Sequence, residues 1–318
     1  MSVEQNELLE KIKNDEELMK KLKDELLSKE KKKRVNNSRR PNIFKGITAM
    51  PYRGSKWKFR NQIYDGLKDI KFENENLKIF DLFGGSGSLS LIFKTLYPKA
   101  QIVLNDYDII IEKDGENIID KSLTLTNEVL NKIRTALTPE DFNKEKIINS
   151  DKIHTIINEY KEQLDKDIIA TQAIASNINF NGRYELNAAT YWNRIKKTDY
   201  EMYYHNFEGI KIIHEDFEKV LKDESENEEK DITKLFLLDP PYLYTDTTGY
   251  NTKYWKLSKY LFMLVYIFKH QNYKFILFEG KKSCLDDIFS FFEELNTIKL
   301  NYKRVPISKN EFMILINF

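Results

Sequence analysis

The residues best suited to chemistry are Asp239, Pro240, Pro241 and Tyr242, which follow the apolar run 235–238. A carboxylate and a fixed carbonyl can accept the two hydrogens of an exocyclic amine, while the second proline leaves no backbone N–H to compete. The tyrosine ring supplies a stacking face. This tetrapeptide therefore predicts a site for an amine carried on a flat ring. For an Asp-Pro-Pro taken by itself, a strand that ends at a proline-rich loop is the alternative.

A glycine-rich turn upstream favours the chemical interpretation. Residues 81–88 read Asp-Leu-Phe-Gly-Gly-Ser-Gly-Ser, between a predicted strand at 77–80 and a predicted helix at 89–96. Glycines let the backbone approach a ligand closely, and the following helix presents its amide end to that ligand. The spacing is neither Gly-x-Gly-x-x-Gly nor that of a P-loop. Further along, Asp106 follows the apolar run 102–104, at a strand end where an acid can bind a ribose diol.

Taken in order, these motifs resemble those of the Dam-type adenine-specific DNA methyltransferases, the alpha group of amino-methyltransferases. The resemblance spans residues 48–318. In that family a Tyr-x-Gly-Gly-Lys element lies near the amino terminus, and here Ser55 replaces its second glycine. The family's Phe-x-Gly-x-Gly is complete. The motifs that carry the resemblance are Pro51-Tyr52-Arg53-Gly54-Ser55-Lys56, Phe83-Gly84-Gly85-Ser86-Gly87, Asp106, Asp216-Phe217 and Asp239-Pro240-Pro241-Tyr242.

The resemblance implies S-adenosylmethionine as the cofactor. The amino-terminal element of the family helps to hold the methionine part of that molecule. Asp106 would bind the ribose, and Asp216 with Phe217 would hold the cofactor adenine. The cofactor residues implied in this way are Tyr52, Lys56, Asp81, Phe83, Gly85, Gly87, Asp106, Asp216 and Phe217.

A region between these motifs is similar to the family's Phe-Asn-Gly region, which lies near the substrate DNA. It covers residues 177–183 and 191–194, and the predicted DNA contacts are Asn181, Arg183 and Arg194. An ordinary turn at Asn-Gly is the alternative. From about 116 to 207 the pattern is helical and polar, and strand signals are absent. In this family such an insert carries the target-recognition domain.

The elements that must position the motifs alternate as in an α/β protein. We expect a Rossmann-like, mostly parallel sheet with helices on both faces and a ligand crevice beyond the carboxyl ends of the strands. The resemblance implies that the last strand is antiparallel. Further strands are predicted at 210–213, 235–238, 274–278, 298–302 and 312–317, with a helix at 257–268.

Three regions follow from these patterns, and 318 residues suffice for one large core plus an insert. We predict an amphipathic helix and basic linker at 1–40, a catalytic domain at 41–115 and 208–318, and a helical target-recognition domain at 116–207. The first helix could mediate dimerisation or partner binding, or could pack on its own chain; both remain open. The acidic stretch 223–231 is predicted to be a disordered loop.

Composition narrows the class of protein. The net charge is only +1, but residues 29–40 form a basic run. Because the local charge of a surface attracts a polyanion such as DNA, the small net charge does not exclude DNA binding. The only cysteine, Cys284, excludes an internal disulfide and lacks the preceding proline that carbon-5 cytosine methylation requires. The histidines show no ligand spacing, so no metal is expected. The longest apolar stretch, 261–268, is too short to span a bilayer. We expect a soluble, cytoplasmic protein.

The sequence thus predicts methyl transfer to a flipped-out adenine in a specific short sequence of double-stranded DNA, with the base stacked on Tyr242. A cytosine-amine methyltransferase shares the acceptor geometry but tends to carry Ser in place of Asp239. A catalytically idle DNA-binding or regulatory protein that keeps the fold is the other alternative. The Glu279-Gly280-Lys281 stretch has no partner acid, so no cutting activity is expected. A separate restriction endonuclease as partner, and self-association through the first helix, both remain open.

Overall fold

The computed structural model describes residues 43–45, 47, 54–72, 76–144, 146–147, 150–178, 186, 191–192, 195–227, 229, 231–242, 255–280, 285–296 and 300–318. The helix and basic run predicted at 1–40 lie outside these residues. So do Tyr52 and the predicted DNA contacts Asn181, Arg183 and Arg194. All elements below belong to the compact unit Gly46–Phe318.

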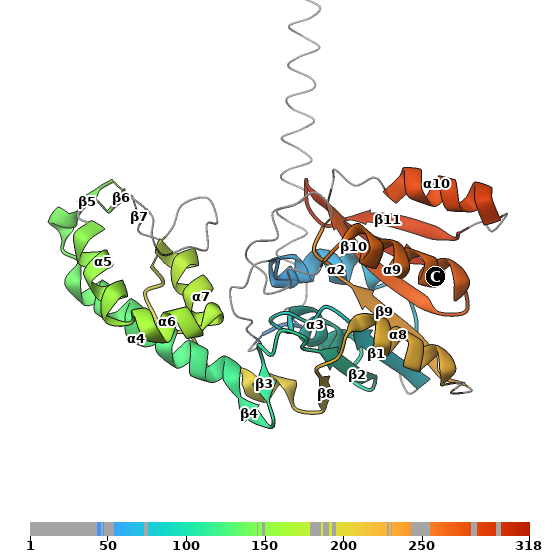
Figure 1. Cartoon of the computed structure of the whole chain (residues 1–318), viewed down its shortest axis with the longest axis horizontal. Helices are drawn as coiled ribbons and strands as arrows, with labels where there is room; N and C mark the ends of the chain where they lie inside the picture. Colours follow the sequence, from blue (N-terminus) through green and yellow to red (C-terminus); the bar gives the residue numbers. More distant parts are fainter. Residues whose placement is uncertain are drawn as a thin grey trace, which may run out of the picture. The chain divides into compact units, whose positions relative to one another are not determined.

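The centre of this unit is a seven-stranded sheet (Figure 1). Its strands are β1 (Leu77–Asp81), β2 (Gln101–Asn105), β8 (Ile210–Ile213), β9 (Thr233–Leu238), β10 (Lys274–Gly280), β11 (Tyr302–Pro306) and β12 (Glu311–Ile316). The order is β11-β12-β10-β9-β1-β2-β8. Strands β8, β2, β1, β9 and β10 pair in parallel, whereas β12 is antiparallel to both β10 and β11. The predicted mostly parallel sheet with an antiparallel last strand is confirmed.

One strand prediction is wrong in position. The run 298–302 was expected to be a strand, but β11 begins only at Tyr302. Leu300, just before β11, explains the difference. Its amide donates to Glu293 of helix α10 (Leu285–Asn296) at 3.0 Å, and its side chain is buried in the core. The apolar residue thus packs beneath a helix instead of pairing along a strand.

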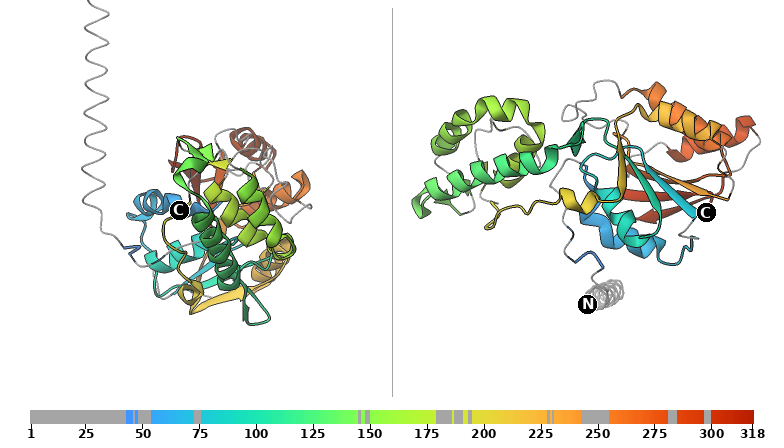
Figure 2. Two further views of the ribbon diagram at one scale, coloured as in Figure 1. Left: turned by 90° about the vertical axis from the view of Figure 1, so that its left-hand side faces the viewer. Right: turned by 90° about the horizontal axis from the view of Figure 1, so that it is seen from below.

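Helices cover both faces of the sheet (Figure 2). One face carries α2 (Arg60–Leu67) and α3 (Ser88–Leu96), and the short helix η1 (Lys56–Phe59) leads into α2. The opposite face carries α8 (Phe217–Glu226), α9 (Leu257–Lys269) and α10, whose apolar side chains join those of the sheet in one core. The central strand β9 is buried over all of 234–238, as expected for a parallel strand covered on both sides.

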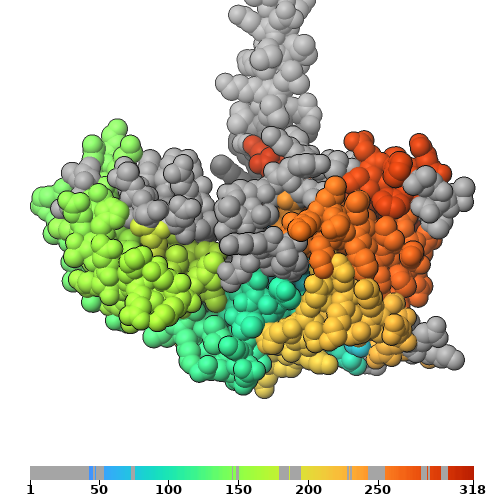
Figure 3. Space-filling view, in the orientation of Figure 1, coloured from blue at the N-terminus to red at the C-terminus, as the bar shows by residue number. Residues whose placement is uncertain are grey.

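The insert is mostly helical. Its helices are α4 (Ile118–Ala136), α5 (Ser150–Glu159), α6 (Lys161–Lys166) and α7 (Ile168–Ile178), with the short helices η3 (Pro139–Asp141) and η4 (Tyr204–Phe207). Side chains of α4, α5 and α7 form a core of their own. At its base, Ile119 and Leu123 pack with Leu104 of β2 and Phe207 of η4. In the space-filling view the start of α4 (blue-green) lies directly against the segment around β8 (gold) (Figure 3).

The predicted absence of strands from 116 to 207 is wrong. A small sheet joins β5 (Phe142–Asn143), β6 (Lys146–Ile147) and β7 (Tyr191–Trp192), and a hairpin joins β3 (Glu112–Lys113) to β4 (Glu116–Asn117). Each strand is only two residues long, and such a strand is too short to produce the alternation by which strands are found in a sequence.

The acidic stretch 223–231 is not a disordered loop over its first half, because residues 223–226 form the last turn of α8. Glu224 explains this order. Its carboxylate lies 2.9 Å from the buried ammonium of Lys234 and 3.5 Å from that of Lys78. A buried lysine needs an opposite charge, so the tertiary structure holds the acid in place. No helix in the described ranges is long and apolar enough to cross a membrane.

Candidate active site

Two of the predicted motifs meet at one edge of the sheet. Strands β1 and β9 are parallel neighbours, with Asp81 opposite Leu237. The segments that follow the two strands therefore leave the sheet at the same edge. The glycine turn and the Asp-Pro-Pro-Tyr segment therefore line a common pocket with an empty volume of about 640 Å³. The remaining wall comes from the start of η1 and of β12. The whole pocket is lined by Gly54, Ser55, Lys56, Phe83, Gly84, Gly85, Ser86, Ser88, Leu89, Asp239, Pro240, Tyr242 and Glu311.

The glycines of the turn differ in what they do. Gly85 lines the pocket and has a positive φ of 49°, which favours glycine. Gly87, with a φ of 71°, precedes α3, and a Cβ at this position would lie 2.3 Å from the ring of Phe207. At Gly84 a Cβ would lie 2.2 Å from the Leu104 side chain. Close packing of the chain on itself thus explains Gly84 and Gly87, whereas Gly85 faces the site.

Ser86, between the two glycines, contributes a polar group to the pocket. The residue is buried, and its hydroxyl has no hydrogen-bond partner among the residues that the structure describes. Buried hydroxyls in proteins are usually satisfied. An unsatisfied one beside a pocket is well placed to bond a polar ligand.

Asp81 lies behind the turn and does not line the pocket. Its Oδ2 accepts hydrogen bonds from the Ser90 amide (3.0 Å) and hydroxyl (2.7 Å), which ties the end of β1 to α3. Burial raises the pKa of this carboxyl to about 7. The described contacts of Asp81 therefore position the glycine turn and do not reach the pocket itself.

Lys56 is the cation of the pocket. Its side chain is only 3% exposed, and its Nζ donates to Asp239 Oδ2 at 2.7 Å and to the Gly54 carbonyl at 2.9 Å. The Lys56 amide donates to the Ser88 hydroxyl at 3.2 Å, which joins η1 to the glycine turn. The sequence prediction placed Lys56 with the cofactor. Its ion pair with Asp239 was not foreseen.

Asp239 and Tyr242 are held in a strongly charged setting. Burial raises the pKa of the Asp239 carboxyl above its ordinary value, although the neighbouring Lys56 ammonium lowers it in part. The Tyr242 hydroxyl lies 3.3 Å from Glu311 Oε2, and its ring centroid lies 5.3 Å from the Lys56 ammonium. Burial and the nearby carboxylates raise the pKa of Tyr242, so the phenol keeps its proton and acts as a donor.

The residues predicted for the adenosine end of the cofactor, Asp106, Asp216 and Phe217, lie outside the pocket lining. One of them contacts the lining residue Phe83. Its ring packs on Phe217, 5.2 Å between centroids, and Phe217 belongs to the core. Asp216 caps α8 by accepting the Glu218 amide at 2.8 Å. Asp106 accepts the amides of Ile110 and Ile111, each at 2.7 Å. Carboxylate oxygens of both acids are thus hydrogen-bonded to backbone amides of their own loops.

Glu311 and Ser86 are pocket residues that the sequence prediction did not assign to the site. Ser86 lies inside a motif that was read for its glycines, and only its burial singles it out. Glu311 precedes the apolar run 312–316, and nothing in that local pattern points to a pocket.

A family model described as D12 class N6 adenine-specific DNA methyltransferase matches residues 52–303. The chain belongs to this family. It is accordingly an adenine-specific DNA methyltransferase, and the match contains every pocket residue except Glu311. The chain is also 31% identical over 264 residues to a Haemophilus influenzae protein that carries a provisional description as a methyltransferase. That alignment covers 81% of this chain and 85% of the relative.

Proposed function

We propose that this methyltransferase transfers a methyl group from S-adenosylmethionine to the exocyclic amine of an adenine that is flipped out of double-stranded DNA. One observation carries the proposal: Asp239, Tyr242 and Lys56 surround a single pocket that also contains the glycine turn. The pocket combines acceptors for an amine, a stacking ring and a binding surface for a small polar molecule.

The pocket suits a ligand that carries both charges, as the methionine part of S-adenosylmethionine does. Lys56 offers a positive charge to a carboxylate, and the carboxylates of Asp239 and Glu311 make the surrounding potential negative, which favours a sulfonium nearby without a direct contact. In this proposal Lys56, Phe83, Gly85 and the Ser86 hydroxyl hold the cofactor directly. Once bound, S-adenosylmethionine supplies an electrophilic methyl group.

The other predicted cofactor residues are proposed to support the residues that contact the cofactor. Tyr52 would complete the amino-terminal element, and Gly87 and Asp81 would fix the turn. The carboxylates of Asp106 and Asp216 accept backbone amides, so they support the cofactor by holding the loops that they cap. Phe217 would act through its packing on Phe83.

The amine of adenine is a poor nucleophile because its lone pair is delocalised into the ring. Asp239 and the Pro240 carbonyl can accept its two hydrogens, which localises the lone pair and directs it at the methyl group. Pro241 adds no competing donor, and Tyr242 stacks on the base. The amine nitrogen forms the new bond to carbon while the carbon–sulfur bond breaks with its electrons on sulfur, which leaves a neutral thioether. The methylated nitrogen then loses its extra proton to solvent. No covalent bond to the enzyme is needed.

The recognised DNA would be a short specific sequence, read by the insert at 116–207. Asn181, Arg183 and Arg194 are the proposed contacts, by resemblance to the family's Phe-Asn-Gly region. A separate restriction endonuclease would be the natural partner of such an enzyme if it belongs to a restriction-modification pair.

Sequencing of modified bases in DNA from cells that express the chain tests the proposal. We expect N6-methyladenine within one short sequence motif, and none in cells that express Asp239→Ala. Methylated cytosine amines in place of methylated adenine would establish the alternative base. Unmodified DNA, with the protein folded and abundant, would refute the proposed activity.

A further inference from the structure

Glu311 reaches the active site because β12 runs antiparallel to the other central strands. It is the first residue of β12 and pairs with Gly280, the last residue of β10. The start of β12 therefore lies at the edge where the parallel strands end. The Glu311 side chain is only 19% exposed and lines the pocket.

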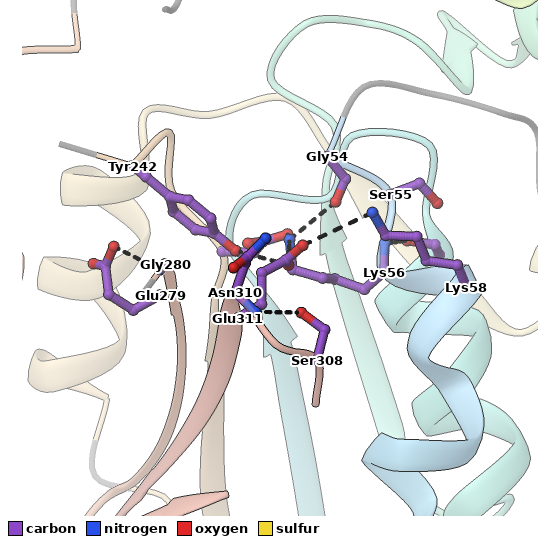
Figure 4. Close-up of polar contacts among 12 residues, drawn as sticks. Gly54, Ser55, Lys56, Lys58, Tyr242, Glu279, Gly280, Ser308, Asn310 and Glu311 are labelled. Atoms are coloured by element: carbon purple, nitrogen blue, oxygen red, sulfur yellow. Dashed lines mark hydrogen bonds and ion pairs between the residues drawn. The ribbon is translucent and has the colours of Figure 1, made fainter. Parts of the chain in front are cut away.

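This carboxylate lies next to both Tyr242 and Lys56 (Figure 4). Glu311 Oε2 lies 3.3 Å from the Tyr242 hydroxyl, which donates to it, and 3.8 Å from Lys56 Nζ. The Lys56 ammonium, in turn, lies 2.7 Å from Asp239 Oδ2. Lys56 is thus shared by two carboxylates, and Glu311 holds both the lysine and the tyrosine.

We propose that Glu311 is a positioning residue for methyl transfer, which fixes Lys56 and Tyr242 so that Asp239 and the tyrosine ring can receive the target adenine. This inference rests on the proposed function. Lys56 lies 2.7 Å from Asp239 and 3.8 Å from Glu311, so the two carboxylates together fix the position of the ammonium beside the aspartate. Glu311 also anchors the hydroxyl of Tyr242, so the ring keeps one orientation in the pocket.

The Glu311 side chain is not needed to close the β11–β12 hairpin, which argues against a purely structural role for it. The amides of Ile307 and Ser308 both donate to the backbone carbonyl of Glu311 at 3.1 Å. These bonds remain when the side chain is changed. The substitution Glu311→Gln should therefore leave the β11–β12 hairpin intact.

The charge of Glu311 also changes the pKa of Asp239, and this effect can be measured. Among the described residues, the charged and titratable groups that act on that carboxylate are Lys56 from η1, Glu311 from β12, Tyr242 from the same loop, Asp81 from β1 and Glu279 from β10. The negative charge of Glu311 raises the pKa of Asp239. Removing that charge favours the ionised aspartate and lowers its pKa. The acid limb of the kcat profile should then move to lower pH.

The test compares Glu311→Gln, Glu311→Ala and the exposed α10 control Glu294→Gln. For each we would measure thermal unfolding, the Kd of S-adenosylmethionine, and kcat against pH with saturating DNA. Glu311→Gln keeps an acceptor for Tyr242, so we expect kcat to fall only a few-fold and the acid limb to shift downward. Glu311→Ala removes the hydrogen bond from Tyr242 and the ion pairs with Lys56 and the exposed Lys58, and we expect a fall on the order of tenfold or more. The control should match the parent.

A double-mutant cycle separates positioning from other roles. If Glu311 acts through the tyrosine hydroxyl, Tyr242→Phe should cost much less in the Glu311→Ala background than in the parent. Parental kcat and an unshifted pH profile in Glu311→Gln would overturn the inference. So would a loss of cofactor affinity with kcat unchanged, which would make Glu311 a ligand contact. A parent enzyme that methylates no DNA would refute the proposed function, and the inference with it.

Discussion

At the scale of single residues, the site is organised around one shared cation. Two carboxylates, Asp239 and Glu311, lie within 3.8 Å of the Lys56 ammonium. Burial alone would favour a neutral aspartate, and the ammonium opposes that effect. This balance lets Asp239 remain an acceptor although its side chain is only 15% exposed. The motif alone identified the aspartate, but its pairing required the folded chain.

Asp239→Ala should separate chemistry from binding. We expect kcat to fall by roughly two to three orders of magnitude, because the variant lacks the acceptor aimed at the reacting amine. The Kd values for cofactor and DNA should change little. Single-turnover methylation and calorimetric titration measure the two quantities, with the exposed Asp287→Ala of α10 as the matched control. More than a tenth of parental turnover would make the aspartate a structural residue.

Asp81 should make stability depend on pH. Its pKa is raised to about 7 in the folded protein from an ordinary value of 3.8, so the folded state holds its proton more tightly than the unfolded state. The free energy of unfolding should therefore fall as pH rises from about 4 to 7, by up to about 4 kcal/mol. Urea unfolding across this range measures it.

In Asp81→Asn this part of the pH dependence should disappear, because an amide has no proton to lose. The Asn oxygen can still accept from Ser90, so the fold should persist. An identical decline of stability with pH in Asp81→Asn would assign the effect to other carboxyls.

At the scale of elements, strand direction decided what local patterns could not. An acid that follows a parallel strand is expected at the ligand edge, and Asp106 and Asp239 were proposed for the site in this way. Glu311 precedes its strand, and it reaches the same edge only because β12 is antiparallel. The direction of β12 was implied by family resemblance, and the resemblance made no connection to Glu311.

The turn before α3 offers a second test at this scale. Gly87→Ala should lower stability by about 1 to 3 kcal/mol, because φ is positive and the new Cβ would lie 2.3 Å from Phe207. Gly115→Ala is a matched control, since its φ of 80° is also positive but nothing lies within 4 Å of the added carbon. The difference in unfolding free energy between the two variants isolates the clash. Equal losses would mean that backbone strain alone explains Gly87.

At the scale of the whole molecule, the catalytic pocket is built on the sheet, whereas the proposed DNA contacts come from the insert. This division predicts separable defects. Arg183→Ala or Arg194→Ala should weaken DNA binding without changing cofactor affinity. The salt slope should flatten by roughly one for each phosphate interaction that a substitution removes. An arginine that reads a base should instead cost about 1 to 3 kcal/mol on the preferred site and little on random DNA.

Deletion of residues 1–40 provides the contrast. The basic run there can supply only attraction that does not depend on sequence, so the truncated enzyme should bind DNA more weakly at low salt. The pattern of methylated adenines should stay the same, as sequencing of the modified DNA would reveal. A changed pattern would place sequence reading in the amino-terminal segment and not in the insert.

The sequence by itself determined most strands of the large sheet, the glycine turn and the tetrapeptide Asp239–Tyr242 as a candidate site, because each depends on a few neighbouring residues with a period or a spacing that can be read directly. Local pattern failed at 298–302, at the two-residue strands of the insert and at the acidic end of α8. In the first and last of these, contacts from elsewhere overrode the local signal. The tertiary structure alone decided which side chains share the pocket. Lys56 and Asp239 are 183 residues apart, and Gly87 is explained by Phe207. Such pairs depend on strand order and direction, which no single segment encodes.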